Sequence, residues 1–97
     1  MTIYIKKFGE VLTSRQAGRE AYAAFLPTLT ELTKNEDIFI DFEGVQAFSP
    51  SWGDEFLTPF IEKFPKHLYI KKEKNPSVIL TLQMLEQVHA PYTFSFV

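Results

Sequence analysis

Residues 38–64, IFIDFEGVQAFSPSWGDEFLTPFIEKF, hold a strand, a turn and the start of a helix in direct succession. The run 38–40 is continuously apolar, which is typical of a strand that is covered on both faces. Gly44 and the turn 49–51 follow, and apolar side chains then recur at helical spacing: Trp52, Phe56, Phe60 and Phe64. A strand that leads through a loop into a helix is the repeating unit of α/β folds, which usually place function at that loop.

The helix in this stretch has predicted boundaries. Ser51 is expected to cap it, with Asp54 reaching back to the capping backbone. Pro59 should either kink the helix or end it near Thr58, because proline lacks a donor and clashes with the preceding turn. Trp52 shares a face with the phenylalanines, so we expect it in the core, although an aromatic beside a loop can also anchor a partner.

The residues before this stretch predict one strand and one helix. Residues 3–8, IYIKKF, are rich in β-branched and aromatic types, which favours a strand. Thr13 and Gln16 fit a capping box, so a helix is expected over 14–34, kinked or restarted at Pro27. Arg15 and Arg19 lie one turn apart on it, where we expect a solvated face, an anion site or pairs with Glu20 and other acidic neighbours.

The residues after it predict a strand, a helix and a last strand. The strand covers 67–71, and Asn75 is expected to cap a helix that begins at Pro76. The buried stripe of this helix is expected to be Val78, Ile79, Leu82 and Leu85. Tyr92, Phe94 and Phe96 alternate with smaller side chains, which predicts an edge strand with one apolar side.

This order of elements predicts an α/β fold for residues 1–97, with three main helices and a sheet of about four strands, mixed or mostly parallel. The chain has 97 residues, 45% of them hydrophobic and 23% charged, which indicates one globular domain.

Composition argues against several functional classes. The net charge of −2 and the interruption of Lys71, Lys72 and Lys74 by Glu73 argue against nucleic-acid binding. The absence of cysteine excludes disulfides, thiol chemistry and the usual structural zinc sites. No apolar run is long enough to span a bilayer, so we expect no membrane association and a cytoplasmic location.

The start of the central helix carries the candidate site, Ser49, Ser51, Trp52, Asp54 and Glu55. A helix start presents unpaired backbone donors and a partial positive charge, so it suits a phosphate, a phosphorylated serine or simply a cap.

The other possible chemistries are weaker. Asp41, Glu43, Asp54 and Glu55 border one loop, but capping explains the last two, so no metal ligand or catalytic residue is predicted. His67 and His89 lack metal-binding spacing, and the chain has neither a nucleophile elbow nor a glycine-rich phosphate loop. We therefore expect no enzyme and no cofactor.

The same stretch resembles the STAS domains of anti-sigma-factor antagonists, in which a strand ending D-x-x-G-V runs through a serine-bearing turn into a helix. Asp41, Gly44 and Val45 match that pattern. It is more similar still to the STAS-like family of unknown function, whose turn is followed by S-F-x-D-E, here residues 51–55. An arginine-containing helix start, here residues 13–19, is similar to that family too.

The resemblance implies a single STAS-like domain over 1–97 and a mostly non-catalytic role. Such domains bind a protein partner through this loop and helix, in many antagonists a kinase that resembles histidine-kinase ATPases. The antagonists are phosphorylated on a serine in D-S-S/T-G. The aligned residues here are Ser49, Pro50, Ser51 and Trp52, so proline occupies the acceptor position. Asp54 and Glu55 would also repel a phosphate on Ser51.

The leading hypothesis is therefore a non-enzymatic regulatory module that binds a partner through residues 41–57. The alternative is a sensor of a small anion or nucleotide at the same helix start. A cryptic hydrolase or transferase is the third reading.

Overall fold

Four parallel strands form the main sheet of the computed structural model, which describes residues 1–32 and 35–97. Their spatial order is β1 (Thr2–Tyr4), β3 (Ile38–Asp41), β5 (Leu68–Ile70) and β6 (Ser95–Phe96). A second sheet pairs β2 (Val11–Leu12) with β4 (Ala47–Phe48), also in parallel. The predicted α/β fold is confirmed, with β3 inside the main sheet and β6 at its edge.

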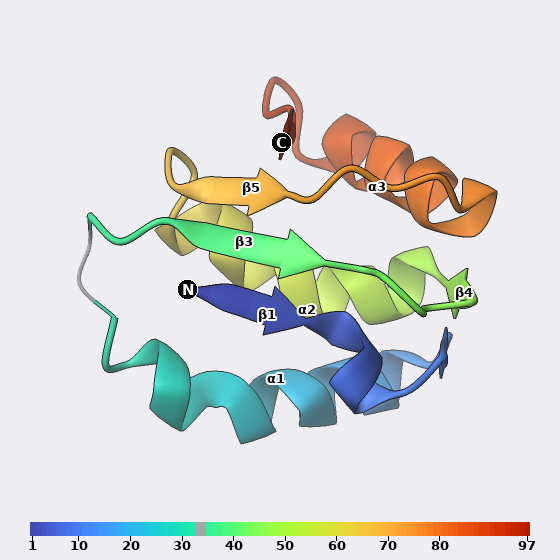
Figure 1. Ribbon diagram of the computed structural model, residues 1–97, viewed down its shortest axis with the longest axis horizontal. Coiled ribbons are helices and arrows are strands. Elements are labelled where there is room, and N and C mark those ends of the chain that lie inside the picture. The colour runs from blue at the N-terminus through green and yellow to red at the C-terminus, as the bar shows by residue number, and fades with distance from the viewer. Residues whose placement is uncertain (33–34) are drawn as a thin grey trace.

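Three α-helices connect these strands: α1 (Arg15–Leu29), α2 (Pro50–Lys63) and α3 (Pro76–Val88). The sheet order follows the chain order, so right-handed crossovers all step in the same direction and place every helix on the same face. In Figure 1, α2 lies behind β1, β3 and β5, while α1 and α3 flank it. None of these helices is long and apolar enough to cross a membrane, as far as residues 1–32 and 35–97 are concerned.

The two faces of the main sheet have different surroundings. The side chains that point toward the helices are at most 2% exposed: Ile3, Ile38, Ile40, Leu68 and Ile70. Phe39 and Tyr69 alternate with them, and their rings stack on the opposite face with centroids 5.4 Å apart. Among the described residues no helix covers that face. The prediction that β3 is covered on both faces was therefore wrong, because Phe39 contributes to the apolar run without entering the core.

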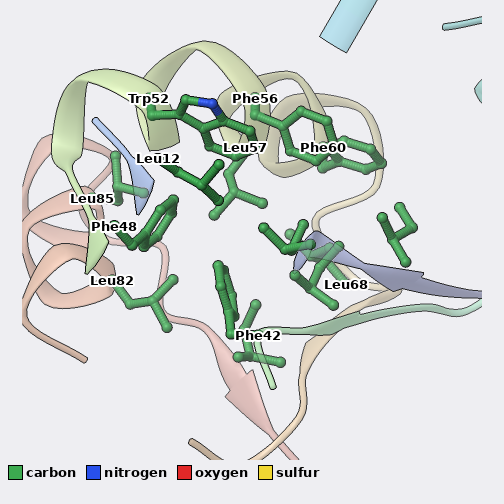
Figure 2. Packing of buried hydrophobic residues seen from close by; sticks show 14 of the residues in the cluster. Leu12, Phe42, Phe48, Trp52, Phe56, Leu57, Phe60, Leu68, Leu82 and Leu85 are labelled. Atoms are coloured by element: carbon green, nitrogen blue, oxygen red, sulfur yellow. The ribbon is translucent and has the colours of Figure 1, made fainter. Parts of the chain in front are cut away.

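Aromatic side chains dominate the core between the sheet and α2. Figure 2 shows Trp52, Phe56 and Phe60 in a row along α2, above Phe48 and Phe42. The ring centroids are 5.0 Å apart for Trp52 and Phe56, and 5.4 Å for Phe56 and Phe60. Trp52 is buried, as predicted. Helix α2 continues through Pro59 to Lys63, so of the two predicted alternatives, a kink or an early end near Thr58, the early end does not occur.

Several boundaries in the first third of the chain differ from the prediction. The first strand ends at Tyr4, and a 3-10 helix, η1 (Ile5–Phe8), replaces its second half. This turn brings Phe8 onto Phe56, with ring centroids 5.0 Å apart, instead of along the sheet. Ser14, not Thr13, caps α1 by accepting a hydrogen bond from the Ala17 amide at 3.0 Å.

The end of α1 and the last two elements also differ in extent. The helix ends at Leu29, two residues beyond Pro27, and the predicted end at 33–34 lies outside the described residues. Asn75 caps α3 and Pro76 begins it, as predicted. The predicted buried stripe holds except at Ile79, which is only partly buried. Strand β6 is shorter than predicted, and only Phe94 of the expected apolar side is fully buried.

Candidate functional site

The loop after β3 is fixed by hydrogen bonds at both ends. Asp41 accepts a bond from the Glu43 amide at 2.9 Å, and Gly44 turns the chain with φ 86°, a conformation that suits glycine. The Asn75 side chain donates to the carbonyls of Val45 and Gln46 at 2.9 and 3.0 Å. The residue that caps α3 therefore also holds this loop in place.

Ser49 caps α2. Its Oγ accepts a bond from the Trp52 amide at 3.3 Å and donates to the Thr13 carbonyl at 2.8 Å. The predicted cap, Ser51, was wrong by two residues, because Pro50 takes the first helical position, where its fixed φ is favoured. The hydroxyl of Ser49 is thus engaged within the fold.

Ser51 is the serine of the junction whose hydroxyl does not cap the helix. It is the second residue of α2, partly exposed, and its hydroxyl makes no hydrogen bond to any residue in the described ranges. Trp52 beside it points into the core. Of the predicted site, Ser51, Asp54 and Glu55 therefore contribute to the surface, whereas Ser49 and Trp52 support the fold.

Asp54 and Glu55 form ion pairs with α1. Arg15 Nη1 lies 2.8 Å from Asp54 Oδ2 and 3.2 Å from Glu55 Oε1, and Arg19 Nη2 lies 3.4 Å from Glu55 Oε1. The hydrogen bond from Arg15 lowers the pKa of Asp54 below its ordinary value, and the same bond raises the pKa of Arg15. The prediction that Asp54 returns to the capping backbone was wrong. The pair with Glu20 considered from the sequence does not form, because Glu20 accepts a hydrogen bond from Gln16. The partners of the arginines on α2, Asp54 and Glu55, were not predicted.

A close approach of α1 and α2 makes these ion pairs possible. A Cβ atom at Gly18 would lie 2.6 Å from the Trp52 carbonyl oxygen. Only glycine fits there without displacing backbone, so Gly18 lets α1 lie against the first turn of α2. The arginines of α1 then reach the carboxylates of α2.

A polar chain continues from this cluster to the end of α3. Thr58 Oγ1 donates to Asp54 Oδ1 at 3.0 Å and lies 2.9 Å from His89 Nε2. A threonine hydroxyl has one proton, and Thr58 donates it in the hydrogen bond to the Asp54 carboxylate. His89 Nε2 must therefore carry a proton and donate to the Thr58 oxygen. In this arrangement His89 cannot act as a base toward the Thr58 hydroxyl.

A groove lies beside the ion pairs, between the start of α2 and α3. It has a volume of about 240 Å³ and is lined by Arg15, Pro50, Asp54, Met84, Leu85, Gln87 and Val88. Met84 is 43% exposed and Val88 is 71% exposed. We call it the α2–α3 groove.

The contribution of α3 to this groove was missed in the sequence. A signal was present, because α3 carries apolar side chains all around its axis and only one charged residue, Glu86. A helix that is apolar on every side is normally buried all round. Apolar side chains that stay exposed on such a helix mark a candidate interaction surface.

Within residues 1–32 and 35–97, no group of three or more metal-ligating side chains is placed to hold an ion. Asp54 and Glu55 are engaged with arginines instead.

No protein-family model, curated protein or solved structure matches the chain. The STAS-like resemblance therefore stays a prediction drawn from the junction residues.

Proposed function

We propose that this protein is a non-enzymatic regulatory module that binds a partner protein in the α2–α3 groove. The observation that carries the proposal is a groove whose apolar lining, Pro50, Met84, Leu85 and Val88, is bordered by the Arg15–Asp54 ion pair. Ser51 follows Pro50 in the sequence. An apolar centre with a polar, charged rim is the usual anatomy of a protein interface.

The exposed side of α3 favours a helical segment of the partner. Leu80, Met84 and Val88 are exposed and spaced four residues apart, so they form one apolar stripe along the helix. An amphipathic helix laid beside such a stripe buries its own apolar side and leaves its polar side to meet Arg15, Asp54 and Gln87. In line with the resemblance, the partner class we propose is an ATPase similar to histidine kinases.

The first turn of α2 offers little to a small anion. Pro50 has no amide hydrogen, and the Trp52 amide is bonded to Ser49. The Ser51 amide and hydroxyl remain, with Asp54 and Glu55 close by in sequence. Binding of an anion or nucleotide at this helix start is therefore the second candidate, supported by one free backbone donor and one free hydroxyl.

A hydrolase is disfavoured by the arrangement around Thr58. In a hydrolytic triad the imidazole lies between the nucleophile and the carboxylate that orients it. Here the Thr58 hydroxyl lies between Asp54 and His89, so the carboxylate does not orient the imidazole as a base. Thr58 and His89 are better explained as a link between α2 and α3.

Binding of the ATPase-type partner, measured by calorimetry with purified proteins, tests the proposal. We expect Val88→Glu and Ser51→Glu each to weaken binding about tenfold or more. Val88→Glu places a charge in the apolar lining of the groove, and Ser51→Glu adds a second negative charge near Asp54. Val11→Glu is the matched control, because this substitution makes the same chemical change outside the groove. Val11 lies on β2 and is 63% exposed.

Two results would overturn the proposal. One is a partner that binds the Val88→Glu and Ser51→Glu proteins as tightly as the native one. The other is stabilisation of the isolated protein by phosphate or nucleotides that Ser51→Glu abolishes, which would support the anion sensor.

A further inference from the structure

The uncovered face of the main sheet is a second candidate surface, separate from the α2–α3 groove. We call it the open face; its residues come from β1, β3, β5 and β6 and their immediate neighbours, and they are Thr2, Tyr4, Asp37, Phe39, Asp41, His67, Tyr69, Lys71 and Ser95. Parallel sheets are normally covered on both faces, so an open one that carries aromatic side chains is unusual. In Figure 1 this face is turned toward the viewer.

The two middle strands of the open face carry opposite charges in the same pattern. Phe39 pairs in register with Tyr69, and the register continues through Ile40 and Ile70. Asp41 therefore lies beside Lys71, and Asp37 lies beside His67, with Nδ1 of the imidazole 2.9 Å from Oδ1 of the carboxylate. On the open face, β3 and its neighbours thus present an acidic, an aromatic and an acidic side chain in succession. The corresponding positions of β5 are basic, aromatic and basic.

We propose that a second copy of this chain covers the open face, related by a two-fold axis that runs parallel to the strands between β3 and β5. This rotation places β3 of each copy over β5 of the other. Asp41 then faces Lys71 of the second copy, and Phe39 faces its Tyr69. Each contact occurs twice, as an isologous interface requires.

The charge pattern also selects this orientation over the other two-fold arrangement. An axis across the strands would place β3 over β3, and Asp37 would meet Asp41 of the second copy. Like charges brought together in an interface are strongly unfavourable, whereas complementary charges fix the orientation of the two partners. The axis along the strands brings every carboxylate opposite a base.

The outer strands are compatible with the same axis. β1 of one copy would lie over β6 of the other. Thr2 pairs in register with Phe39, and Ser95 pairs in register with Tyr69, so Thr2 would face Ser95. Both side chains are small and carry a hydroxyl. The main sheet has four strands, roughly 15 Å across at about 4.8 Å per spacing. The strands have two to four residues and run at most roughly 13 Å at about 3.3 Å per residue. The face formed by the strands alone is therefore roughly 200 Å², well below the roughly 800 Å² per partner of a standard interface, so we expect a weak, reversible dimer.

A single-stranded nucleic acid fits the open face less well. Bases stack on free aromatic faces, but Phe39 and Tyr69 stack on each other with ring planes 24° apart, and Lys71 Nζ lies 5.7 Å from the Phe39 ring centre. The carboxylates of Asp37 and Asp41 would also repel phosphates. The observations therefore favour the second copy.

Charge reversal with sedimentation equilibrium tests the dimer, from about 10 µM to about 1 mM protein, where a weak interface associates. The native mass should rise from 11.2 kDa toward twice that value. Asp41→Lys and Lys71→Asp should each weaken association about tenfold or more, because like charges then face each other twice. The double variant, Asp41→Lys with Lys71→Asp, should restore it to within about threefold of native, because the charges are again complementary.

Glu62→Lys on α2 is the control, since it makes the same change of charge at an exposed position away from the open face, and it should leave association unchanged. A native protein that stays at 11.2 kDa throughout would overturn the proposal. So would single reversals without effect, a double variant that fails to recover although folded, or an oligonucleotide whose binding Tyr69→Ala abolishes.

Discussion

The two faces of the four-stranded sheet differ in exposure: helices cover one face and leave the other open, although the residues of both faces alternate along the same strands. On the covered face, Ile38 and Ile40 are fully buried against the helices. Phe39, between these two isoleucines, and Asp41, directly after them, point to the open face and stay partly exposed. Alternation along a strand thus separates residues that hold the fold from residues that are available for binding.

The comparison teaches where to look for function in this chain. The covered face and the first turn of α2 are engaged in packing and capping, which accounts for Trp52 and Ser49. The open face and the exposed stripe of α3 carry apolar side chains that no described residue covers. Both proposals above rest on these uncovered surfaces.

The largest expected effect separates the two faces by neighbouring substitutions. Ile40→Ala should lower the free energy of unfolding by about 2 to 5 kcal/mol, because it leaves a cavity in the core. Phe39→Ala should cost only about 1 kcal/mol, the scale of a cross-strand pair and strand propensity. Urea unfolding of dilute protein measures both, and equal losses would contradict the distinction between the faces.

A smaller effect is expected on the covered side, where α1 meets α2. Gly18→Ala should destabilise the protein by about 1 to 2 kcal/mol, since a clash with the Trp52 carbonyl outweighs the better helix propensity of alanine, which is worth about 1 kcal/mol. The exposed Ala23 gives the control, because Ala23→Gly should cost about 0.5 to 1 kcal/mol from propensity alone. Thermal unfolding that shows Gly18→Ala to be stabilising would mean that the helices are farther apart.

The smallest effect concerns Asp54, whose side chain is 39% exposed. Its pKa is lowered in the folded protein by the hydrogen bond from Arg15, so this contribution to stability is present above the unfolded pKa and is lost as the pH falls through the folded pKa. Arg15→Gln should raise the pKa of Asp54 and flatten the loss of stability in acid. An NMR titration of the Asp54 carboxyl measures this, and an unchanged pKa in the variant would show that the ion pair does not form.

Much of the fold was predictable because the elements have strong local signals. The helix beginning at Pro76 follows from its asparagine cap and proline start, and the core face of α2 follows from the spacing of Trp52, Phe56 and Phe60. The four-stranded α/β arrangement follows from alternating strands and helices. These features depend on residues close together in sequence.

What escaped prediction depends on contacts between distant segments. Ser49 caps α2 while bonding Thr13, Arg15 pairs with Asp54, and Gly18 meets Trp52; in each case the partners are more than thirty residues apart. The open face was missed because Phe39 makes the run 38–40 look buried on both sides. The α2–α3 groove was missed because its floor comes from two helices.

NMR line broadening by a soluble gadolinium chelate tests the central claim most directly, that one face of the main sheet is uncovered. In dilute protein we predict strong broadening of the ring signals of Tyr4, Phe39 and Tyr69, and little broadening of those of Trp52, Phe56 and Phe60. Rings of Phe39 and Tyr69 that are as protected as Phe56 in the dilute monomer would contradict the claim.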